Sequence, residues 1–543
     1  MSSVPATRLN LALGLLCLVL ALPVLSLASA WFNLDATALD VLRHQFSTVL
    51  PAYAGNSLLL AIAVGVGVAM VGTGAAAAVT LFDFPGRRMF ELALLLPLAM
   101  PAYVLAYVYT DTFQSSGELQ TWLRLKTGAS GALWPDVRNL GGAVVLFVLA
   151  LYPYVYLLAR TAFAGRGSTL LEAARLLGAG LWRRVGQIAL PLARPAIAAG
   201  VSLALMETLA DYGVGAYFGL QTFTTGIYRA WLSFGDRIAA AQLATVLLVV
   251  VAGLVWLEQR AQARMRFVSS RPGGRGADAQ PLRLRGPAAW AATLVCTLPA
   301  VLGFVLPVIL LIRLVLLEHT HGEFGLPWER FLTWSWASLR LAGSAAALAA
   351  LFALVLAFAV RLRPSWPLQV GIRVVSLGYA VPGAVIAIGL LLPAGWLQAR
   401  WPDSTWGTLL TSTSFGLIYA YMVRFSAVAL QSVQAGYARL PPSLDESSRM
   451  LGAGPVRLFW QVHAPLLLPS VLGAALLVFV DVMKELPATL VLRPFESDTL
   501  AIVAYQLARD ERLAEAALPS LAIVLVGLIP VLMLSRAIRR AAS

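Results

Sequence analysis

The chain has few of the residues that build catalytic centres or disulfide-bonded domains. It has two cysteines and four histidines among 543 residues. Cys17 and Cys296 both fall inside apolar stretches, where we expect buried thiols rather than a disulfide or a metal pair. The patterns G-x-S-x-G and H-E-x-x-H are absent, which argues against the esterase and zinc-protease mechanisms that need them. We expect no enzyme activity on this chain.

Charged residues are also scarce, at 12% of the chain, against 59% hydrophobic residues. That balance excludes a soluble globular protein. Lys126 and Lys484 are the two lysines, and neither lies in a G-x-x-x-x-G-K-[ST] phosphate loop. Any ATP hydrolysis would therefore take place on another chain. The net charge of +14 fits basic loops on one membrane face better than nucleic-acid binding.

Long apolar stretches predict an all-α integral membrane protein with about twelve transmembrane helices. A helix of roughly 20 apolar residues spans a bilayer. We interpret Leu11–Ala30 as a retained span rather than a cleaved signal peptide. The predicted spans are 11–30, 57–82, 90–110, 142–162, 196–217, 239–257, 288–317, 339–360, 371–393, 407–430, 466–483 and 518–535.

One stretch occurs twice, at a constant offset of 274 residues. The first copy runs from Thr169 to Pro195 and the second from Ser443 to Pro469. Thr169-x-x-Glu172 and Ser443-x-x-Glu446 fit a capping box, which would fix the start of a short helix. A left-handed C-cap is expected at Gly178 and Gly452. Each copy therefore predicts a helix, a glycine turn and a second helix between two spans.

The repetition extends over the whole chain. Ser57-Leu-x-Leu-Ala61 matches Ser338-Leu-x-Leu-Ala342, and Pro101 matches Pro382, both at an offset of 281. We predict a first six-span repeat over residues 1–257 with its loop at 166–195. A flexible basic linker is expected at 258–287. A second six-span repeat would cover 288–543, with its loop at 440–469. Six spans per repeat predict two parallel repeats related by an axis along the membrane normal.

The positive charges predict the orientation. Placing both termini, both repeated loops and the linker on one side gives that side most of the 40 Lys and Arg. Since loops rich in Lys and Arg stay in the cytoplasm, the termini and the repeated loops should be cytoplasmic.

Four acidic residues fall within or beside the spans. Glu207 and Asp211 have Asp481 and Glu485 at the matching positions of the second repeat. A charge at mid-bilayer costs roughly 2.5–3.5 kcal/mol on insertion scales, so these side chains should avoid lipid. They could line a substrate path at a central axis, where a hard trivalent cation would find oxygen ligands. They could equally pair with Arg229, Lys484 or buried backbone.

Three further groups suit structural roles. His319-Thr-His321 with Glu318 and Glu323 is a weak metal pattern, better explained as a solvated loop, and we assign no metal site firmly. His463 is expected to pack against a partner ATPase or lipid headgroups. Aromatic residues near span ends should anchor the protein at the membrane interface; they are Tyr103, Tyr107, Tyr109, Trp334 and Trp336.

The repeated stretch resembles the cytoplasmic "EAA" loop of the membrane subunits of bacterial ABC importers. The first copy matches the Glu-Ala-Ala pattern literally, whereas Ser447 and Ser448 replace both alanines in the second. The resemblance implies a type I importer fold, and docking of each loop on one of two ABC ATPase subunits that bind ATP and Mg. The residues carried over to this coupling role are Glu172, Ala173, Arg175, Gly178, Glu446, Arg449 and Gly452.

Other segments resemble the fused ferric-ion permeases: Met206–Gly213, Thr222–Trp231, Asp481–Pro494 and Ala504–Ala508. This resemblance implies a bacterial inner-membrane permease that takes Fe3+ from a periplasmic ferric-binding protein and moves it inward by alternating access. The family's iron-chelating tyrosines belong to the binding protein.

The residues leave alternatives open, among them a membrane scaffold that would carry no solute flux. The other two are transporters. One is a related permease for thiamine or another small solute, which shares the double loop without needing the acidic quartet. The other is an ion-coupled secondary transporter, which has no use for a repeated docking loop. The choice of Fe3+ over similar cations as the substrate rests on the resemblance alone.

Overall fold

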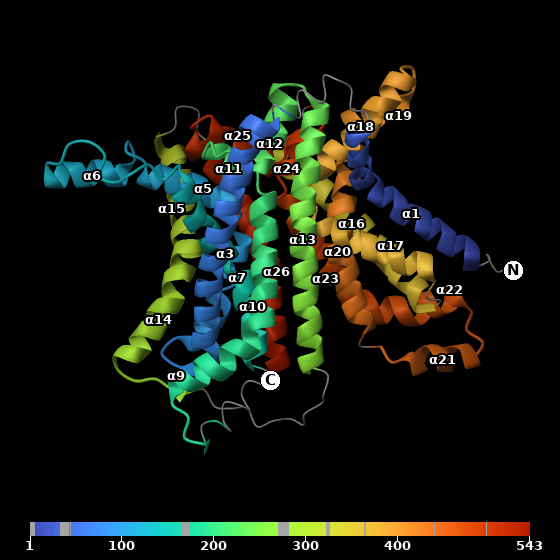
Figure 1. Ribbon diagram of the computed structural model, residues 1–543, viewed down its shortest axis with the longest axis horizontal. Helices are drawn as coiled ribbons and strands as arrows, with labels where there is room; N and C mark the ends of the chain where they lie inside the picture. Colours follow the sequence, from blue (N-terminus) through green and yellow to red (C-terminus); the bar gives the residue numbers. More distant parts are fainter. Residues whose placement is uncertain are drawn as a thin grey trace. The chain divides into compact units, whose positions relative to one another are not determined.

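The computed structural model describes residues 6–32, 43, 45–164, 174, 176–269, 282–321, 326–362, 365–438, 440–495 and 497–542. Within these residues the fold is all-helical apart from β1 (Phe82–Asp83) and β2 (Leu282–Arg283), which pair in parallel. Eleven described helices are long and apolar enough to cross a membrane, and the bent pair 87–99 with 102–127 would make a twelfth. The predicted multi-pass α-helical membrane fold is confirmed (Figure 1).

The chain forms two compact units. The first consists of Met1–Arg43, Ile227–Leu248 and Trp328–Val503, and the second of the remaining segments. Unit 1 contains α1 (Ala6–Ser26), η1 (Leu27–Trp31), η5 (Arg229–Ser233), α16 (Trp328–Leu362), α17 (Trp366–Leu377), η7 (Gly378–Ala380), α18 (Gly383–Arg400), α19 (Thr405–Ser412), α20 (Ser414–Tyr437), α21 (Pro442–Met450), α22 (Pro455–Leu458), η8 (Phe459–His463), α23 (Ala464–Met483) and α24 (Pro487–Leu492).

Unit 2 contains β1, β2, η2 (Gln45–Val49), α3 (Leu50–Leu81), α4 (Arg87–Ala93), η3 (Leu96–Ala99), α5 (Ala102–Phe113), α6 (Glu118–Thr127), α7 (Leu140–Ala164), α9 (Leu181–Arg184), η4 (Val185–Ala189), α10 (Leu190–Ala210), α11 (Gly213–Tyr217), α14 (Pro287–Ala300), η6 (Val301–Val305), α15 (Leu306–His321) and α26 (Leu513–Ala542). The division between the units falls within α12 (Phe223–Tyr228), α13 (Arg237–Ser269) and α25 (Leu500–Arg509).

Each unit has a three-helix centre, and the two centres occupy equivalent positions in the repeats. In unit 2, α3, α7 and α10 pack together, and in unit 1, α16, α20 and α23 do the same. The N-terminal α1 packs on α17 and α18 of unit 1, whereas α14 packs on α3, and α15 on α26, in unit 2. The compact units therefore do not follow the boundaries of the sequence repeats, because the first helix of each repeat packs on helices of the other.

Equivalent hydrogen bonds recur in the two repeats. The Oγ of Ser57 accepts from the amide of Phe223 at 3.2 Å, and the Oγ of Ser338 accepts from the amide of Leu500 at 2.8 Å. Both serines thus hold the start of a short helix, α12 or α25. Arg183 donates to Gln187 at 3.0 Å, and the matching Arg457 donates to Gln461 at 2.8 Å.

Three sequence-based expectations need correction. The third and ninth predicted spans are not continuous helices: the chain breaks at Pro101 and at Pro382, and the first break bends the pair by 93°. Proline lacks the amide hydrogen that helix continuation needs. The predicted linker 258–287 begins as helix, because α13 runs to Ser269.

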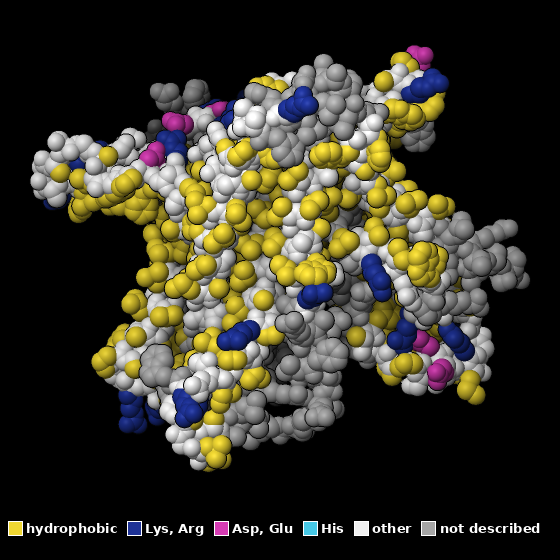
Figure 2. Space-filling view, viewed as in Figure 1, with side chains coloured by type: hydrophobic (Ala, Val, Ile, Leu, Met, Phe, Trp, Pro, Cys, Tyr) yellow, Lys and Arg dark blue, Asp and Glu magenta, His cyan; other side chains and the backbone are white. Residues whose placement is uncertain are grey.

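The predicted interfacial role of Tyr103, Tyr107 and Tyr109 is wrong, since all three side chains are buried. Trp336 is exposed, as expected. Apolar residues on α3, among them Leu58, Ile62 and Met70, are also exposed, and Figure 2 shows hydrophobic side chains along this helix. Such a surface suits lipid contact.

Glycines allow the helices of unit 2 to approach closely. A Cβ atom on Gly72 of α3 would lie 2.7 Å from the Cβ of Val155 on α7. A Cβ atom on Gly200 of α10 would lie 2.7 Å from the Cα of the same valine. Small residues at such crossings let helix backbones pack in a membrane, where the hydrophobic effect gives little help.

We predict that Gly72→Ala destabilises unit 2 by about 1–3 kcal/mol, because the new methyl group overpacks the crossing. The thermal midpoint of the detergent-solubilised protein would fall. The control is Gly253→Ala on α13, where a Cβ meets no atom within 4 Å. Equal midpoints for the two variants would contradict the close-packing argument.

Candidate functional site

The second repeated loop forms a helix–turn–helix, α21 and α22, in unit 1. The helix α21 begins after Pro441 with Pro442 in its first turn, where the fixed φ of proline favours helix initiation. The predicted capping box at Ser443 is therefore wrong, because Ser443 lies inside the helix and no side chain caps the N-terminus. Thr169 and Glu172, its counterparts in the first loop, lie outside the described residues.

The glycine turn is confirmed in both loops. Gly178 and Gly452 both have φ of +79°, which L side chains rarely adopt. The amide of Ala453 donates to Ser448 O at 3.0 Å, and that of Gly452 to Arg449 O at 2.9 Å. This pair of bonds is a Schellman motif. The matching bond of the first loop, from Ala179 N to Ala174 O, is 2.9 Å.

Asp445 anchors α21 to the rest of unit 1. Its Oδ2 accepts from Nε of Arg361, at the end of α16, at 2.8 Å. Its Oδ1 lies 2.9 Å from Nε2 of His463, and Nδ1 of that ring lies 3.1 Å from the hydroxyl of Tyr437, at the end of α20. His463 is completely buried, so its expected contact with a partner or with headgroups is wrong. The four side chains tie the loop to three helical segments.

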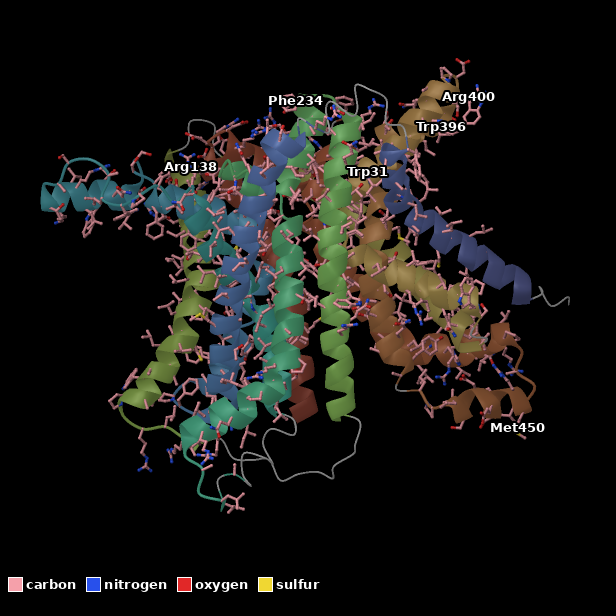
Figure 3. All side chains as sticks on the ribbon, viewed as in Figure 1. Trp31, Arg138, Phe234, Trp396, Arg400 and Met450 are labelled. Carbon is pink, nitrogen blue, oxygen red and sulfur yellow. The ribbon has the colours of Figure 1, made fainter. Side chains whose placement is uncertain are left out.

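The tips of both loops expose apolar side chains. Met450 and Leu451 are 89% and 85% exposed, and the matching Leu176 and Leu177 are 89% and 87% exposed. Met450 lies on the outer side of α21 (Figure 3). Glu446 and Arg449 are also exposed, whereas Glu172, Ala173 and Arg175 lie outside the described residues. Paired apolar tips on otherwise polar loops are typical of a protein-binding surface.

The acidic pair of unit 2 lies at the end of α10. Glu207 is half-buried on the last turns of the helix, and Asp211 follows its last residue in an extended conformation. Oδ1 of Asp211 accepts from the amide of Val214 at 2.8 Å. Asp211 therefore holds the start of α11 as an N-cap residue does.

The acidic pair of unit 1 makes the equivalent contacts at the end of α23. Oε1 of Glu485 accepts from the amide of Ala488 at 2.9 Å, and Oε2 accepts from the amide of Thr489 at 3.0 Å. Asp481 is 2.9 Å from Nζ of Lys484. In this unit Asp481 therefore pairs with Lys484, and Glu485 pairs with buried backbone amides. The sequence had left this alternative open.

Glu485 also forms a buried ion pair that the sequence reasoning missed. Nη1 of Arg424, on α20, is 3.1 Å from Oε1 of Glu485, whose side chain is 1% exposed. Thr489 adds a hydroxyl bond to Glu485 at 2.5 Å and bonds Tyr421 at 2.7 Å. Arg424 lies inside the predicted span 407–430, and a charged residue within a span was the sequence signal that could have indicated a buried ion pair. A meeting of the two acidic pairs at a common axis remains a prediction.

No described group of three or more His, Cys, Asp or Glu residues could hold a metal ion. Glu323 and the side chain of His321 lie outside the described part of the chain. The loop motif around them therefore gains no support as a metal site.

We predict that Arg424→Met strongly destabilises unit 1. Removing one partner of a buried ion pair leaves the other charge uncompensated and costs about 3–5 kcal/mol. The double variant Arg424→Met with Glu485→Gln should recover part of that loss in thermal unfolding. A double variant less stable than the single one would contradict the assigned pairing.

We predict that the stability of the α21 loop depends on pH through the ionisation of Asp445. Burial opposes ionisation of Asp445, but hydrogen bonds from Arg361 and His463 outweigh it and hold the pKa below the usual value. The stabilisation is therefore complete above the unfolded pKa of about 3.9 and is lost as pH falls through the lower folded pKa.

Hydrogen-exchange protection factors of the α21 amides should show that decline. In Asp445→Asn, protection should be low at every pH, whereas the neighbouring exposed Glu446→Gln should behave as wild type. Protection in Asp445→Asn equal to wild type would rule out the anchor.

Comparison with known proteins agrees with the doubled organisation. The pattern of binding-protein-dependent transport system inner membrane components matches twice, at residues 69–266 and 349–542. The chain is 27% identical over 535 residues to the Fe(3+)-transport system permease protein FbpB 2 of Haemophilus influenzae, covering 96% of this chain and 98% of the relative.

Two other relatives match less of the chain. The ferric transport system permease protein FbpB of Actinobacillus pleuropneumoniae is 24% identical, over 77% of this chain and 61% of the relative. The molybdenum transport system permease protein ModB of Escherichia coli is 28% identical, over 33% of this chain and 81% of the relative. With both repeats matched, the chain belongs to the family of binding-protein-dependent transport system inner membrane components and carries the family's domain twice.

Proposed function

We propose that this chain is the membrane permease of an ATP-driven importer that carries ferric iron from a periplasmic binding protein to the cytoplasm. The observation that carries the proposal is the pair of loops with the same glycine turn and the same exposed apolar tips. The choice of ferric iron is supported by the Haemophilus influenzae relative, which matches nearly the whole chain.

The loops would dock on two ABC ATPase subunits, which bind ATP and Mg. On this reading Leu176, Leu177, Met450 and Leu451 enter the ATPase surface, and Glu446 and Arg449 contribute polar contacts beside them. Glu172, Ala173 and Arg175 take the matching places in the first loop. The Schellman turns at Gly178 and Gly452 keep each tip at a fixed angle to the following span.

Transport would proceed by alternating access in the bacterial inner membrane. The basic loops and both termini face the cytoplasm, in keeping with the distribution of Lys and Arg. ATP closes the ATPase dimer and draws the two loops together, which opens the path toward the binding protein. Hydrolysis then returns the path to the cytoplasmic side.

The acidic residues favour a cation as cargo. Glu207 and Asp211 would repel an anionic solute and attract a hard cation. The molybdenum permease matches one third of this chain, so the Fe(3+)-transport relative, which matches 96% of it, is the better guide. Thiamine, another cationic solute, is the alternative that a transport assay must separate.

The first test is uptake of radioactive ferric iron into proteoliposomes that hold this chain, its ATPase and its binding protein. Uptake should require ATP, stop with a hydrolysis-deficient ATPase and resist competition by thiamine. Assembled transporter that moves thiamine but no iron would contradict the proposal.

The loops can be tested in the same assay. Gly178→Val with Gly452→Val should abolish uptake while ATP hydrolysis continues, because a β-branched residue is strained at φ of +79°. The matched control is Gly180→Val with Gly454→Val, at positions without positive φ where a Cβ meets no atom. Coupled uptake by the first variant would overturn the role of the turns.

A further inference from the structure

Phenol side chains of α5 and α25 in unit 2 pack against Tyr212 and Tyr217, in the segment that follows Asp211. We propose that Tyr107, Tyr505 and Asp211, supported by Tyr103 and Tyr212, form a transient binding site for ferric iron inside the permease. The proposal rests on the proposed function and names the place in unit 2 where the ion would bind during transport.

Three segments far apart in sequence bring these groups together. From α5, Tyr103 and Tyr107 have ring centroids 5.7 Å apart. From α25, the Tyr505 hydroxyl lies 3.4 Å from that of Tyr212, the residue after Asp211. The Tyr505 ring also packs against that of Tyr212, with ring centroids 5.8 Å apart, and the Tyr107 ring packs against that of Tyr217 on α11. The cluster therefore brings phenol rings from α5 and α25 against the segment that follows Asp211.

Tyr107 combines a buried, unpartnered hydroxyl with a place in this tyrosine cluster. Its side chain is 3% exposed, and its hydroxyl has no hydrogen-bond partner among the described residues. Burying a hydroxyl without a partner costs roughly 1–3 kcal/mol in proteins, and such groups call for an explanation such as an absent ion. Tyr107 also packs edge-on against Tyr217, with ring centroids 4.9 Å apart, so its ring is held in place.

The chemistry of the cluster suits a trivalent ion. Hard cations select oxygen ligands, and phenolate and carboxylate are both anionic oxygens. The Asp211 carboxylate with the phenolates of Tyr107 and Tyr505 would supply three negative charges and neutralise Fe3+ in a buried site. Binding would release the two phenol protons to water, as metal binding to protonated ligands requires. A divalent ion would leave the same site with a net negative charge.

The equivalent position of unit 1 is built differently. Glu485, the counterpart of Asp211, is paired with Arg424, whereas the first repeat has Ala150 at the position matching Arg424. Tyr228 lies five residues after Phe223, as Tyr505 lies five residues after Leu500, and it donates its hydroxyl to the backbone oxygen of Pro487. The acid of the second repeat thus lies beside an arginine, while tyrosine rings pack against the segment that follows the acid of the first repeat.

The test uses the complete transporter in lipid nanodiscs, titrated with ferric nitrilotriacetate while visible absorption is recorded. Coordination by tyrosine should produce a phenolate-to-iron charge-transfer band. Tyr107→Phe should weaken the band and lower iron uptake at least tenfold, Tyr107→Phe with Tyr505→Phe should abolish the band, and Asp211→Asn should weaken iron binding. The matched control is Tyr152→Phe on α7, another buried tyrosine without a hydroxyl partner in the described structure, which should keep both band and uptake.

The outcomes separate this site from the proposed function. Normal ATP-driven iron uptake by Tyr107→Phe, or a wild-type protein without the band, would overturn the site and leave the importer intact. A wild-type transporter that neither imports nor binds iron would overturn both. The Tyr107→Phe protein that loses iron uptake should still unfold at the wild-type midpoint. A lowered midpoint in that variant would instead assign Tyr107 a packing role and overturn its role as a ligand.

Discussion

The structure depends on how the protein satisfies backbone groups where its membrane helices break. Lipid offers no hydrogen bonds, so a helix end inside the membrane needs partners from the protein itself. Asp211 and Glu485 accept from the amides of Val214 and Ala488, and Ser57 and Ser338 accept at the starts of α12 and α25. Each repeat uses the same kinds of group at the same positions, which permits short broken helices beside the acidic residues.

Once a carboxylate is held at such a break, the two repeats can use it in different ways. Arg424 neutralises Glu485 in unit 1, and this pair joins α20 to the segment between α23 and α24. In unit 2 tyrosine rings pack against the segment that follows the corresponding acid, Asp211, a setting that we assign to transient ion binding. The two repeated loops also differ from each other. Asp445 and His463 anchor α21 in the second loop, whereas the first repeat has Ala189 at the position of His463.

Sequence reasoning succeeded where a physical rule acts locally. The left-handed turns at Gly178 and Gly452 followed from the cost of positive φ, and the number of spans followed from hydropathy. It failed where tertiary contact decides the outcome. Tyr107 has the pattern of an interfacial anchor yet is buried against Tyr103 and Tyr217. The roles of Arg424 and Asp445 could not be predicted, because their partners lie 61 and 84 residues away.

The proposed coupling between ATP binding and the membrane path can be measured directly. Gln187 and Gln461 are exposed at matching positions of the two loops, behind the apolar tips, so spin labels there should leave docking intact once Cys17 and Cys296 are replaced. In the assembled transporter, pulsed electron spin resonance should report a shorter distance between the labels with ATP and a hydrolysis-deficient ATPase than without nucleotide. A distance distribution unchanged by ATP, in a transporter that still imports iron, would contradict the account.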